Sequence, residues 1–443
     1  MPWLRNAFLP AEQMNPSDEF FALLAPLLQP LELNQFKTSL NQDPERAGWK
    51  LPWKRWAPHL TQFLTLNLPD AFLLPLDFRP SRDPAWHAGM YYCQEPSAMR
   101  SIYEILKHEH LPRRFNSIVD LCSSPGGKTL QLKSLLSEGG VLIANELDPK
   151  RWKILAENME RAGVADVLLS RYSPNQLCGP LKQWAQLVLV DAPCSGEALF
   201  RRTPSMRSHW SIQAVKSCAL RQHKILESAC ELLCSGGILV YSTCTFNPLE
   251  NEDVIHSLLA SKPEFSVLSF RRFWPQRGEG EGQFVAVLQK SGALDSPAIR
   301  RREKVPVKRG ETFGWLEVFL ESLPEGRVQR QQDKIIYFPA YRFKVSLPVP
   351  RQGVVVGRVK VGKKMKIVPT HALAMMMESL QNAPTRDLSY EESMEFLKGR
   401  ELEAPGAQDG WTLVTYHSQG LGWGKVVQSR MKNHYPSAFR MNS

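Results

Sequence analysis

Two cysteines, Cys194 and Cys244, each follow an apolar run that predicts a buried strand. They are the residues of this chain best suited to covalent chemistry. Cys194 comes after 187–190 and Cys244 after 238–241. A thiolate is a strong nucleophile, and its pKa falls near a cation or a helix N-terminus. Ligands bind at the carboxyl ends of the strands in an open α/β sheet, so we expect both thiols to face one cleft.

Together with Asp191, these thiols could add a methyl group to C5 of a pyrimidine. Attack of a thiolate on C6 makes C5 electron-rich, and C5 can then take a methyl group from a sulfonium donor. That reaction needs a nucleophile, a group that helps release after the C5 proton is removed, and an acid near N3 of the base. Cys244, Cys194 and Asp191 supply all three types. A cysteine outside such strand ends is more often a small buried hydrophobe. We expect that of the following residues: Cys93, Cys178, Cys218, Cys230 and Cys234.

A third strand end opens into a glycine-containing loop that predicts a cofactor site. Glycines let the backbone approach a ligand closely, and the N-terminus of the following helix favours negative charge. The loop matches neither the phosphate loop nor the dinucleotide fingerprint, which disfavours ATP and NAD and leaves S-adenosylmethionine. An acid after the second strand, Glu146, is placed to accept hydrogen bonds from ribose hydroxyls. The loop residues that we expect to line the pocket, with Glu146 and Asp191, are Cys122, Ser123, Ser124, Pro125, Gly126, Gly127 and Lys128.

The elements that must position these residues alternate regularly between strand and helix. Helix-spaced crossovers between apolar strands favour a doubly wound parallel α/β sheet, a Rossmann-like core. The helix before the strand 238–242 is expected to stop at Gly236-Gly237. The predicted strands are 117–121, 141–145, 166–170, 187–191 and 238–242, and the predicted helices are 18–28, 97–107, 128–137, 149–162 and 211–234.

Charge divides the 443 residues unequally. Residues 1–299 hold 31 Lys+Arg and 30 Asp+Glu, a net of +1, whereas 300–443 hold 24 and 14, which accounts for the other +10 of the total +11. A neutral body with a basic C-terminal third favours a polyanionic partner. The eight cysteines show no zinc-site spacing, and no metal is expected. No apolar run is long enough to span a bilayer and the start has no signal pattern, so we expect a cytoplasmic monomer away from membranes.

Composition changes along the chain predict four parts. An N-terminal α+β domain, expected to bind RNA, covers 1–105, and the methyltransferase domain covers 106–292. A basic linker or intermediate region covers 293–349. A β-rich module covers 350–443, with strands expected at 353–361, 365–369 and 410–416, and the resemblance described below implies that it is a PUA-like RNA-binding module.

Several motifs together resemble the NOL1/NOP2/Sun family of RNA cytosine-5 methyltransferases. They cover roughly 87–255 and include the segment 91–97. The C-terminal segments 422–425 and 431–436 resemble the RNA-binding module of bacterial RsmF-type enzymes, which act on 16S rRNA. The motifs are 122–128, 191–197 and 242–245, followed by Asn247-Pro248 and Glu250-Asn251-Glu252.

The resemblance implies a role for each matching residue. Cys244 would be the nucleophile, Cys194 would assist product release, Asp191 would hydrogen-bond the cytosine and Lys128 would order the site. S-adenosylmethionine would be the methyl donor, and 16S rRNA or the small ribosomal subunit the partner. Many members carry an acid after the third strand, near the adenine. This chain has none in 169–174, where Tyr172 or Ser173 would substitute.

Other functions remain open from the sequence alone. A DNA cytosine-5 methyltransferase would attack with the Pro-Cys cysteine and carry a DNA-type target domain. An amino-group methyltransferase would carry Asn/Asp-Pro-Pro-Tyr/Phe in place of Asp-Ala-Pro-Cys. A cytosine-5 methyltransferase acting on tRNA is an alternative. So is a non-catalytic RNA-binding or ribosome-assembly factor, although the presence of both cysteines and Asp191 argues against it.

Overall fold

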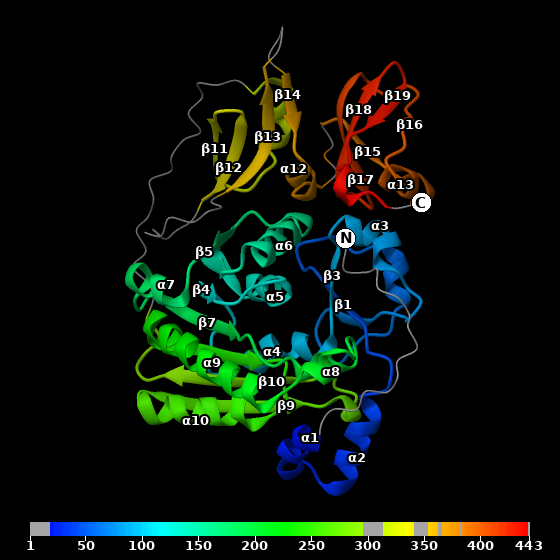
Figure 1. Ribbon diagram of the computed structural model, residues 1–443. Coiled ribbons are helices and arrows are strands. Elements are labelled where there is room, and N and C mark those ends of the chain that lie inside the picture. Colours follow the sequence, from blue (N-terminus) through cyan, green and yellow to red (C-terminus); the bar gives the residue numbers. More distant parts are fainter. Residues whose placement is uncertain are drawn as a thin grey trace.

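A seven-stranded mixed sheet forms the centre of the molecule. The computed structural model describes residues 18–295, 313–340, 353–361, 366–378, 380 and 383–441. The strand order is β6-β5-β4-β7-β8-β10-β9, and β4 to β8 are parallel. The strands are β4 Phe115–Asp120, β5 Leu136–Asn145, β6 Val167–Ser170, β7 Ala185–Asp191, β8 Leu233–Thr243, β9 Phe265–Phe273 and β10 Gln283–Lys290. The expected Rossmann-like core is therefore confirmed (Figure 1).

Two features of this sheet differ from the sequence prediction. Strand β10 is antiparallel to both β8 and β9, so the sheet is not wholly parallel. Only η7, Pro275–Arg277, and a short loop join β9 to β10, and so short a connection permits only antiparallel pairing. The expected stop at Gly236-Gly237 is also wrong. The helix ends at Leu232 and both glycines lie inside β8, where Gly236 has a φ of 67° and packs against the backbone of Leu294.

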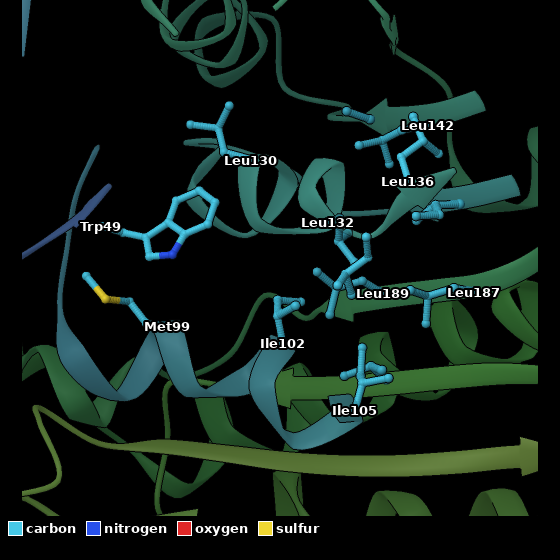
Figure 2. Packing of buried hydrophobic residues seen from close by; sticks show 14 of the residues in the cluster. Trp49, Met99, Ile102, Ile105, Leu130, Leu132, Leu136, Leu142, Leu187 and Leu189 are labelled. Carbon is cyan, nitrogen blue, oxygen red and sulfur yellow. The ribbon is translucent and has the colours of Figure 1, made fainter. Parts of the chain in front are cut away.

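Helices cover both faces of the sheet and bury two separate cores. On one face, α4 to α6 pack in a cluster that includes Met99, Ile102, Leu130 and Leu132 (Figure 2). On the other face, α7, α9 and α10 pack against the remaining inward residues of the same strands. The helices are α4 Pro96–Leu106, α5 Gly127–Ser134, α6 Pro149–Arg161, α7 Pro174–Leu181, α9 Ile212–Leu232 and α10 Glu252–Ser261. No helix among the described residues has both the length and the apolar character needed to cross a membrane.

The N-terminal part contains a helical pair and a three-stranded sheet. Helices α1 and α2 lie at the opposite end of the molecule from the C-terminal modules (Figure 1). The sheet has the order β2-β1-β3, and its β3 leads directly into α4. The elements are α1 Asp18–Leu24, η2 Ala25–Leu27, α2 Pro30–Ser39, β1 Ala47–Lys50, β2 Ala71–Leu73, α3 Pro84–His87 and β3 Tyr91–Gln94.

The C-terminal third forms two sheets, and the first of them starts earlier than predicted. It has the order β11-β12-β13-β14, and the second has the order β15-β17-β18-β19-β16. Strands β11 and β12 fall within the range predicted as a linker, and β12 pairs with β13 across the boundary expected at 350. The basic run 300–309 lies outside the described residues. The strands are β11 Gly326–Gln331, β12 Lys334–Pro339, β13 Val354–Lys360, β14 Lys366–Pro369, β15 Thr385–Asp387, β16 Leu402–Glu403, β17 Gly410–Tyr416, β18 Gln419–Val427 and β19 Arg430–Asn433.

The C-terminal end of α6 is where the parts of the molecule meet. Trp53 of the N-terminal part donates from its indole nitrogen to the Ala162 carbonyl oxygen at 2.9 Å. Gly163 has a φ of 69°, and a Cβ there would lie 2.3 Å from the Met375 carbonyl oxygen at the end of α12, His371–Met375. The N-terminal sheet and the last sheet also share one apolar core, in which His87 hydrogen-bonds the Tyr435 hydroxyl at 2.9 Å.

We predict that Gly163→Ala lowers the thermal midpoint of unfolding. The substitution adds a side chain at positive φ, which costs about 1–3 kcal/mol, and it also drives a methyl group into the Met375 carbonyl. Gly179→Ala is the matched control, because Gly179 is exposed in α7 and its Cβ would meet nothing within 4 Å. Calorimetry of both variants checks this, and an unchanged midpoint for Gly163→Ala would contradict the close approach of α12.

Candidate active site

Parallel pairing of β7 with β8 brings the two predicted thiols together. Asp191 lies opposite Ser242 in this pairing, so the loops that follow the two strands leave the sheet at the same level. The sulfur atoms of Cys194 and Cys244 are 3.2 Å apart, and both cysteines are free thiols. A disulfide would hold the sulfurs at about 2.05 Å, so this separation is that of a hydrogen-bonded pair. The expected meeting of the thiols is what the structure shows.

The environment of the pair distinguishes the two sulfurs. The hydrogen bond with Cys244 raises the pKa of Cys194 well above its usual value, and burial raises it further. Cys194 therefore stays protonated, and its neutral thiol lies within hydrogen-bond distance of the Cys244 sulfur. Both lie at least partly buried, at the ends of strands, as their sequence positions predicted.

Lys128 and Asp191 form an ion pair beside the thiols. The Lys128 ammonium lies 3.0 Å from Asp191 Oδ2, and its side chain is only 9% exposed. Burial alone would lower the pKa of Lys128, but the Asp191 carboxylate and the nearby Cys244 outweigh burial and raise it. The Ser242 hydroxyl donates to Asp191 Oδ1 at 2.7 Å. The site thus holds a fixed cation next to a carboxylate that is 31% exposed and open to a further donor.

A buried carboxylate, Glu250, ties the two cysteine loops together. Its Oε2 accepts from the Ser195 backbone N–H at 3.0 Å and from the Gln222 amide at 2.8 Å. Its Oε1 accepts from the Asn247 amide at 2.9 Å. Burial raises the pKa of Glu250, but every partner at its oxygens is a donor, which favours the carboxylate.

Glu197 makes the reciprocal link from the first loop to the second. Its Oε2 accepts from the backbone N–H of Phe246 at 2.7 Å and of Asn247 at 3.1 Å. Its Oε1 accepts from the Asn247 amide at 2.8 Å and from the Trp210 indole at 2.9 Å. Each loop therefore carries an acid whose partners include backbone N–H groups of the other loop, so the sulfur positions depend on both.

Sequence reasoning assigned no role to these network residues. Glu197, Asn247, Glu250 and Asn251 were quoted only as letters of motifs. Asn251 accepts from the Thr243 hydroxyl at 2.6 Å and donates to the Thr245 carbonyl oxygen at 3.1 Å, which fixes the backbone on both sides of Cys244. The available signal in the sequence was that these four polar residues lie close to the two cysteines. The structure shows that none of the four has exposed surface.

The predicted cofactor loop is fastened to the neighbouring strand and helix. The Ser123 backbone N–H donates to the Asn145 carbonyl oxygen at 2.9 Å, and the Ser124 hydroxyl donates to the Arg151 carbonyl oxygen at 2.9 Å. The Asn158 amide donates to the Pro125 carbonyl oxygen at 2.7 Å. Gly126 has a φ of 116°, and a Cβ there would come within 2.8 Å of Met159. Cys122 packs against the core, and burial raises the pKa of its thiol.

Two acids at this edge of the sheet have oxygens that fit the groups of a nucleoside cofactor. Glu146 is 5% exposed, with Oε1 bonded to the Asp148 N–H at 3.0 Å. Its Oε2 accepts no hydrogen bond from any described residue, although Arg151 lies 3.4 Å away. Asp120 Oδ1 also has no donor within the described chain, and burial raises the pKa of Asp120 to about 7 despite the Thr129 hydroxyl at its other oxygen. Hydroxyl and ammonium groups of S-adenosylmethionine would supply such donors.

The end of the third strand, β6, lacks the acid that many members of the family resembled by the motifs carry there. Asn145 closes this corner, because its side chain accepts from the Tyr172 N–H at 2.9 Å and donates to the Tyr172 carbonyl oxygen at 2.9 Å. The Ser173 side chain caps α7 with Gln176. The Tyr172 side chain packs against the core on the α7 and α9 face, so which of the two residues stands in for the acid stays a prediction.

The remaining cysteines are not hydrogen-bonded to this pair among the described residues, although Cys218 lies within electrostatic range of Cys244. Cys178, Cys230 and Cys234 are buried, whereas Cys93 and Cys218 are partly buried. Burial raises the pKa of Cys93 to about 12 and that of Cys230 to about 12. A neutral thiol in such surroundings is a packing residue.

The N-terminal helices contribute to the site from outside the sheet. Aromatic residues of α1 and α2 share a core with those that follow the two cysteines, and Cys244 packs against its edge. Phe36 meets Phe246 edge-to-face at 5.0 Å, and Phe20 meets Trp210 edge-to-face at 5.5 Å. No motif or spacing in the sequence predicts this contact.

Comparisons with known proteins agree with this geometry. A family model described as 16S rRNA methyltransferase RsmB/F matches 110–289, and one described as the methyltransferase RsmF PUA domain matches 383–441.

Relatives extend the similarity over nearly the whole chain. "Ribosomal RNA small subunit methyltransferase F" of Cronobacter sakazakii is 30% identical over 95% of this chain and 92% of its own. The protein of the same name from Aliivibrio fischeri is 29% identical over 98% and 97%. A solved methyltransferase homolog protein from Pyrococcus horikoshii is 25% identical with a TM-score of 0.50, covering 62% of this chain and 99% of that one.

The full-length similarity to these relatives and the two matched models agree with the paired thiols and the lysine–aspartate pair. This chain belongs to the RsmB/F family of 16S rRNA methyltransferases, in the group that carries an RsmF PUA domain.

Proposed function

We propose that this protein transfers the methyl group of S-adenosylmethionine to C5 of a cytosine in 16S rRNA through a covalent bond between Cys244 and C6. The observation that carries the proposal is the pair of sulfurs 3.2 Å apart beside the Lys128–Asp191 ion pair. A non-catalytic assembly factor would have no use for that arrangement. We further propose that the protein acts in the cytoplasm. We also propose that it acts as a monomer, because one chain supplies every group of the site.

Residues of this chain divide the reaction between them. The Cys244 thiolate attacks C6 and forms the C6–S bond, while the π electron pair of the C5–C6 double bond shifts onto C5, which uses it to bond the methyl group. Asp191, held by Lys128 and Ser242, hydrogen-bonds the cytosine. Residues 122–128 and Glu146 would hold S-adenosylmethionine, which would supply an electrophilic methyl group.

Cys194 acts after the methyl group has reached C5. Its pKa is high because the hydrogen bond with Cys244 and burial both favour the neutral thiol. Once the Cys244 sulfur is bonded to C6, no second thiol group lies beside Cys194, and the Cys194 thiol gives its proton to water more readily. The Cys194 thiolate then takes the C5 proton, the C5–C6 double bond reforms and the electron pair returns to Cys244. A cleft can surround C5 only when the base is unstacked, so the target is an unpaired or flipped cytosine.

We predict that 5-methylcytosine is lost from 16S rRNA in cells that lack this protein. The wild-type gene should restore the modification and the Cys244→Ala variant should not, because the neighbouring Cys194 thiol has a raised pKa and would not supply the attacking thiolate. Bisulfite mapping of 16S rRNA and of tRNA checks both the reaction and the substrate. Loss confined to tRNA would support the alternative substrate, and unchanged maps of both RNAs would refute the enzymatic proposal.

The two thiols should give opposite results when each is replaced. Cys244→Ala should abolish both methyl transfer and any covalent RNA adduct, because the attacking sulfur is gone. Cys194→Ala should accumulate an adduct on methylated RNA, because the C5 proton leaves slowly. Denaturing gels with labelled RNA measure the adduct, and Cys93→Ala, in the N-terminal sheet, is the control. An adduct in the Cys244 variant but not in the Cys194 variant would reverse the assignment.

Glu146→Ala should weaken S-adenosylmethionine binding by roughly ten- to a hundredfold. Hydrogen bonds to a charged group contribute about 1.5–3 kcal/mol, and the buried Glu146 carboxylate has an oxygen to offer. Titration calorimetry measures the effect. Glu157→Ala is the matched control, since Glu157 pairs only with Lys153 on the exposed side of α6. Equal affinity for the wild type and the Glu146 variant would remove Glu146 from the site.

A further inference from the structure

Aromatic side chains gather where the two C-terminal sheets meet, but they are not equivalent. Trp423 on β18 is 2% exposed, and its indole nitrogen donates to the Thr370 carbonyl oxygen at 2.8 Å. Phe319 packs edge-to-face on it with ring centroids 4.9 Å apart. Trp423 is therefore a packing residue that joins the two sheets.

Trp315 behaves differently. It lies in η8, Gly314–Leu316, and stacks on Trp411 of β17 with ring centroids 5.8 Å apart and planes 21° apart. Its side chain is nevertheless 37% exposed, so part of this large apolar ring faces solvent. Trp411 in turn meets the exposed His434 ring at 4.4 Å. The three rings form a continuous aromatic surface, which we call the platform: Trp315, Trp411 and His434.

Strand register places lysines beside the platform. Trp411 pairs with Lys425, and Lys425 pairs with Lys432, so the three residues form one row across β17, β18 and β19. Directly paired residues project from the same face of a sheet. The Lys425 ammonium lies 5.7 Å from the centre of the Trp411 ring.

A third lysine joins this group from the other sheet. Partial burial lowers the pKa of His434, and Lys425, Lys360 and Lys432 lower it further, so all three cations lie within electrostatic range of that ring. Lys360 and Lys432 are exposed, and among the described residues none of the three has a carboxylate partner at ion-pair distance. By contrast, Lys398 in the same third is paired with Glu395 at 2.8 Å.

Packing between the sheets accounts for Trp423 and Phe319 but not for this surface. An exposed tryptophan next to three unneutralised cations fits a ligand with flat apolar faces joined by negative charges. Single-stranded nucleic acid has that chemistry, since bases stack on aromatic rings and phosphates contact lysines. A duplex hides its base faces and cannot use the rings.

We propose that the platform, edged by Lys360, Lys425 and Lys432, binds unpaired nucleotides of the RNA substrate. Bases stack on Trp315 and its aromatic neighbours, while the ammonium groups contact phosphates. This inference rests on the proposed function only in taking RNA as the partner. The proposed RNA contact spans the junction of both C-terminal sheets and is not confined to the last sheet.

Binding of the full-length protein to an oligouridine of about ten nucleotides tests the proposal. Trp315→Ala should weaken binding roughly five- to a hundredfold, and Trp315→Phe should restore most of it by keeping a ring. Lys425→Gln combined with Lys432→Gln should lower the slope of log affinity against log salt by about 1.4, or 0.7 per phosphate contact on a single strand. Binding to a duplex of the same length should change little in Trp315→Ala.

Lys153→Gln combined with Lys398→Gln is the matched control, because it removes the same charge from lysines already paired with carboxylates. S-adenosylmethionine affinity and the thermal midpoint report folding. Wild-type affinity for oligouridine in Trp315→Ala, an equal loss on the duplex, or an equal loss of slope in the control would each overturn the proposal. Methylation of 16S rRNA by the wild type is scored separately. Its absence would refute the proposed function and leave the platform standing.

Discussion

The parallel pairing of β7 with β8 is the constraint on which the site depends. Asp191 and Ser242 lie opposite each other in that pairing, and their side chains are hydrogen-bonded at 2.7 Å. Each strand then leads within three residues to a cysteine, so one register sets the level of both thiols. A slip of one residue would turn alternate side chains to the other face and separate the sulfurs. The apolar residues of both strands, buried on two faces, hold that register.

The register of β7 and β8 does not by itself fix the two cysteine loops. Buried polar groups hold these loops in place. Glu197 and Glu250 each bind backbone N–H groups of a cysteine loop, and Asn247 donates to both. A buried donor without a partner costs about 1–3 kcal/mol, so each loop is stable only in the presence of the other. Because these polar groups are occupied by hydrogen bonds, Asp191 and the two thiols are the reactive side chains that remain accessible. A rigid frame of this kind suits a reaction in which bond-forming atoms must be held close together.

The basic C-terminal third is joined to the catalytic domain rather than loosely tethered. Its α12 packs on the glycine that ends α6, and its last sheet shares a core with the N-terminal sheet. The cofactor loop is fastened to the other end of α6 through Arg151. RNA bound to the C-terminal sheets, as we propose, would therefore be held in a fixed relation to the thiols. Because β12 pairs with β13, truncation of the chain at residue 350 would divide a sheet instead of releasing a module.

The sequence by itself determined the chemistry and most of the sheet. Apolar runs followed by Asp191, Cys194 and Cys244 predicted the strand ends, because buried parallel strands read as continuous hydrophobic segments. Alternation of strands with helix-length crossovers likewise predicted the Rossmann-like core. The antiparallel β9 and β10 were missed, because nothing in a short apolar run reveals the direction of its partner.

Only the tertiary structure decided which polar residues hold the thiols and which aromatic residues stay exposed. Glu250 and Gln222 are 28 residues apart along the chain, yet the Gln222 amide donates to the Glu250 carboxylate at 2.8 Å. Trp315 lies in η8 and Trp411 in β17, 96 positions further along the chain, yet their rings stack. Such contacts depend on how elements pack across long separations, whereas local sequence records only propensity and pattern. Two of the three tryptophans of the C-terminal third, Trp423 buried and Trp315 exposed, are the same residue type until packing separates them.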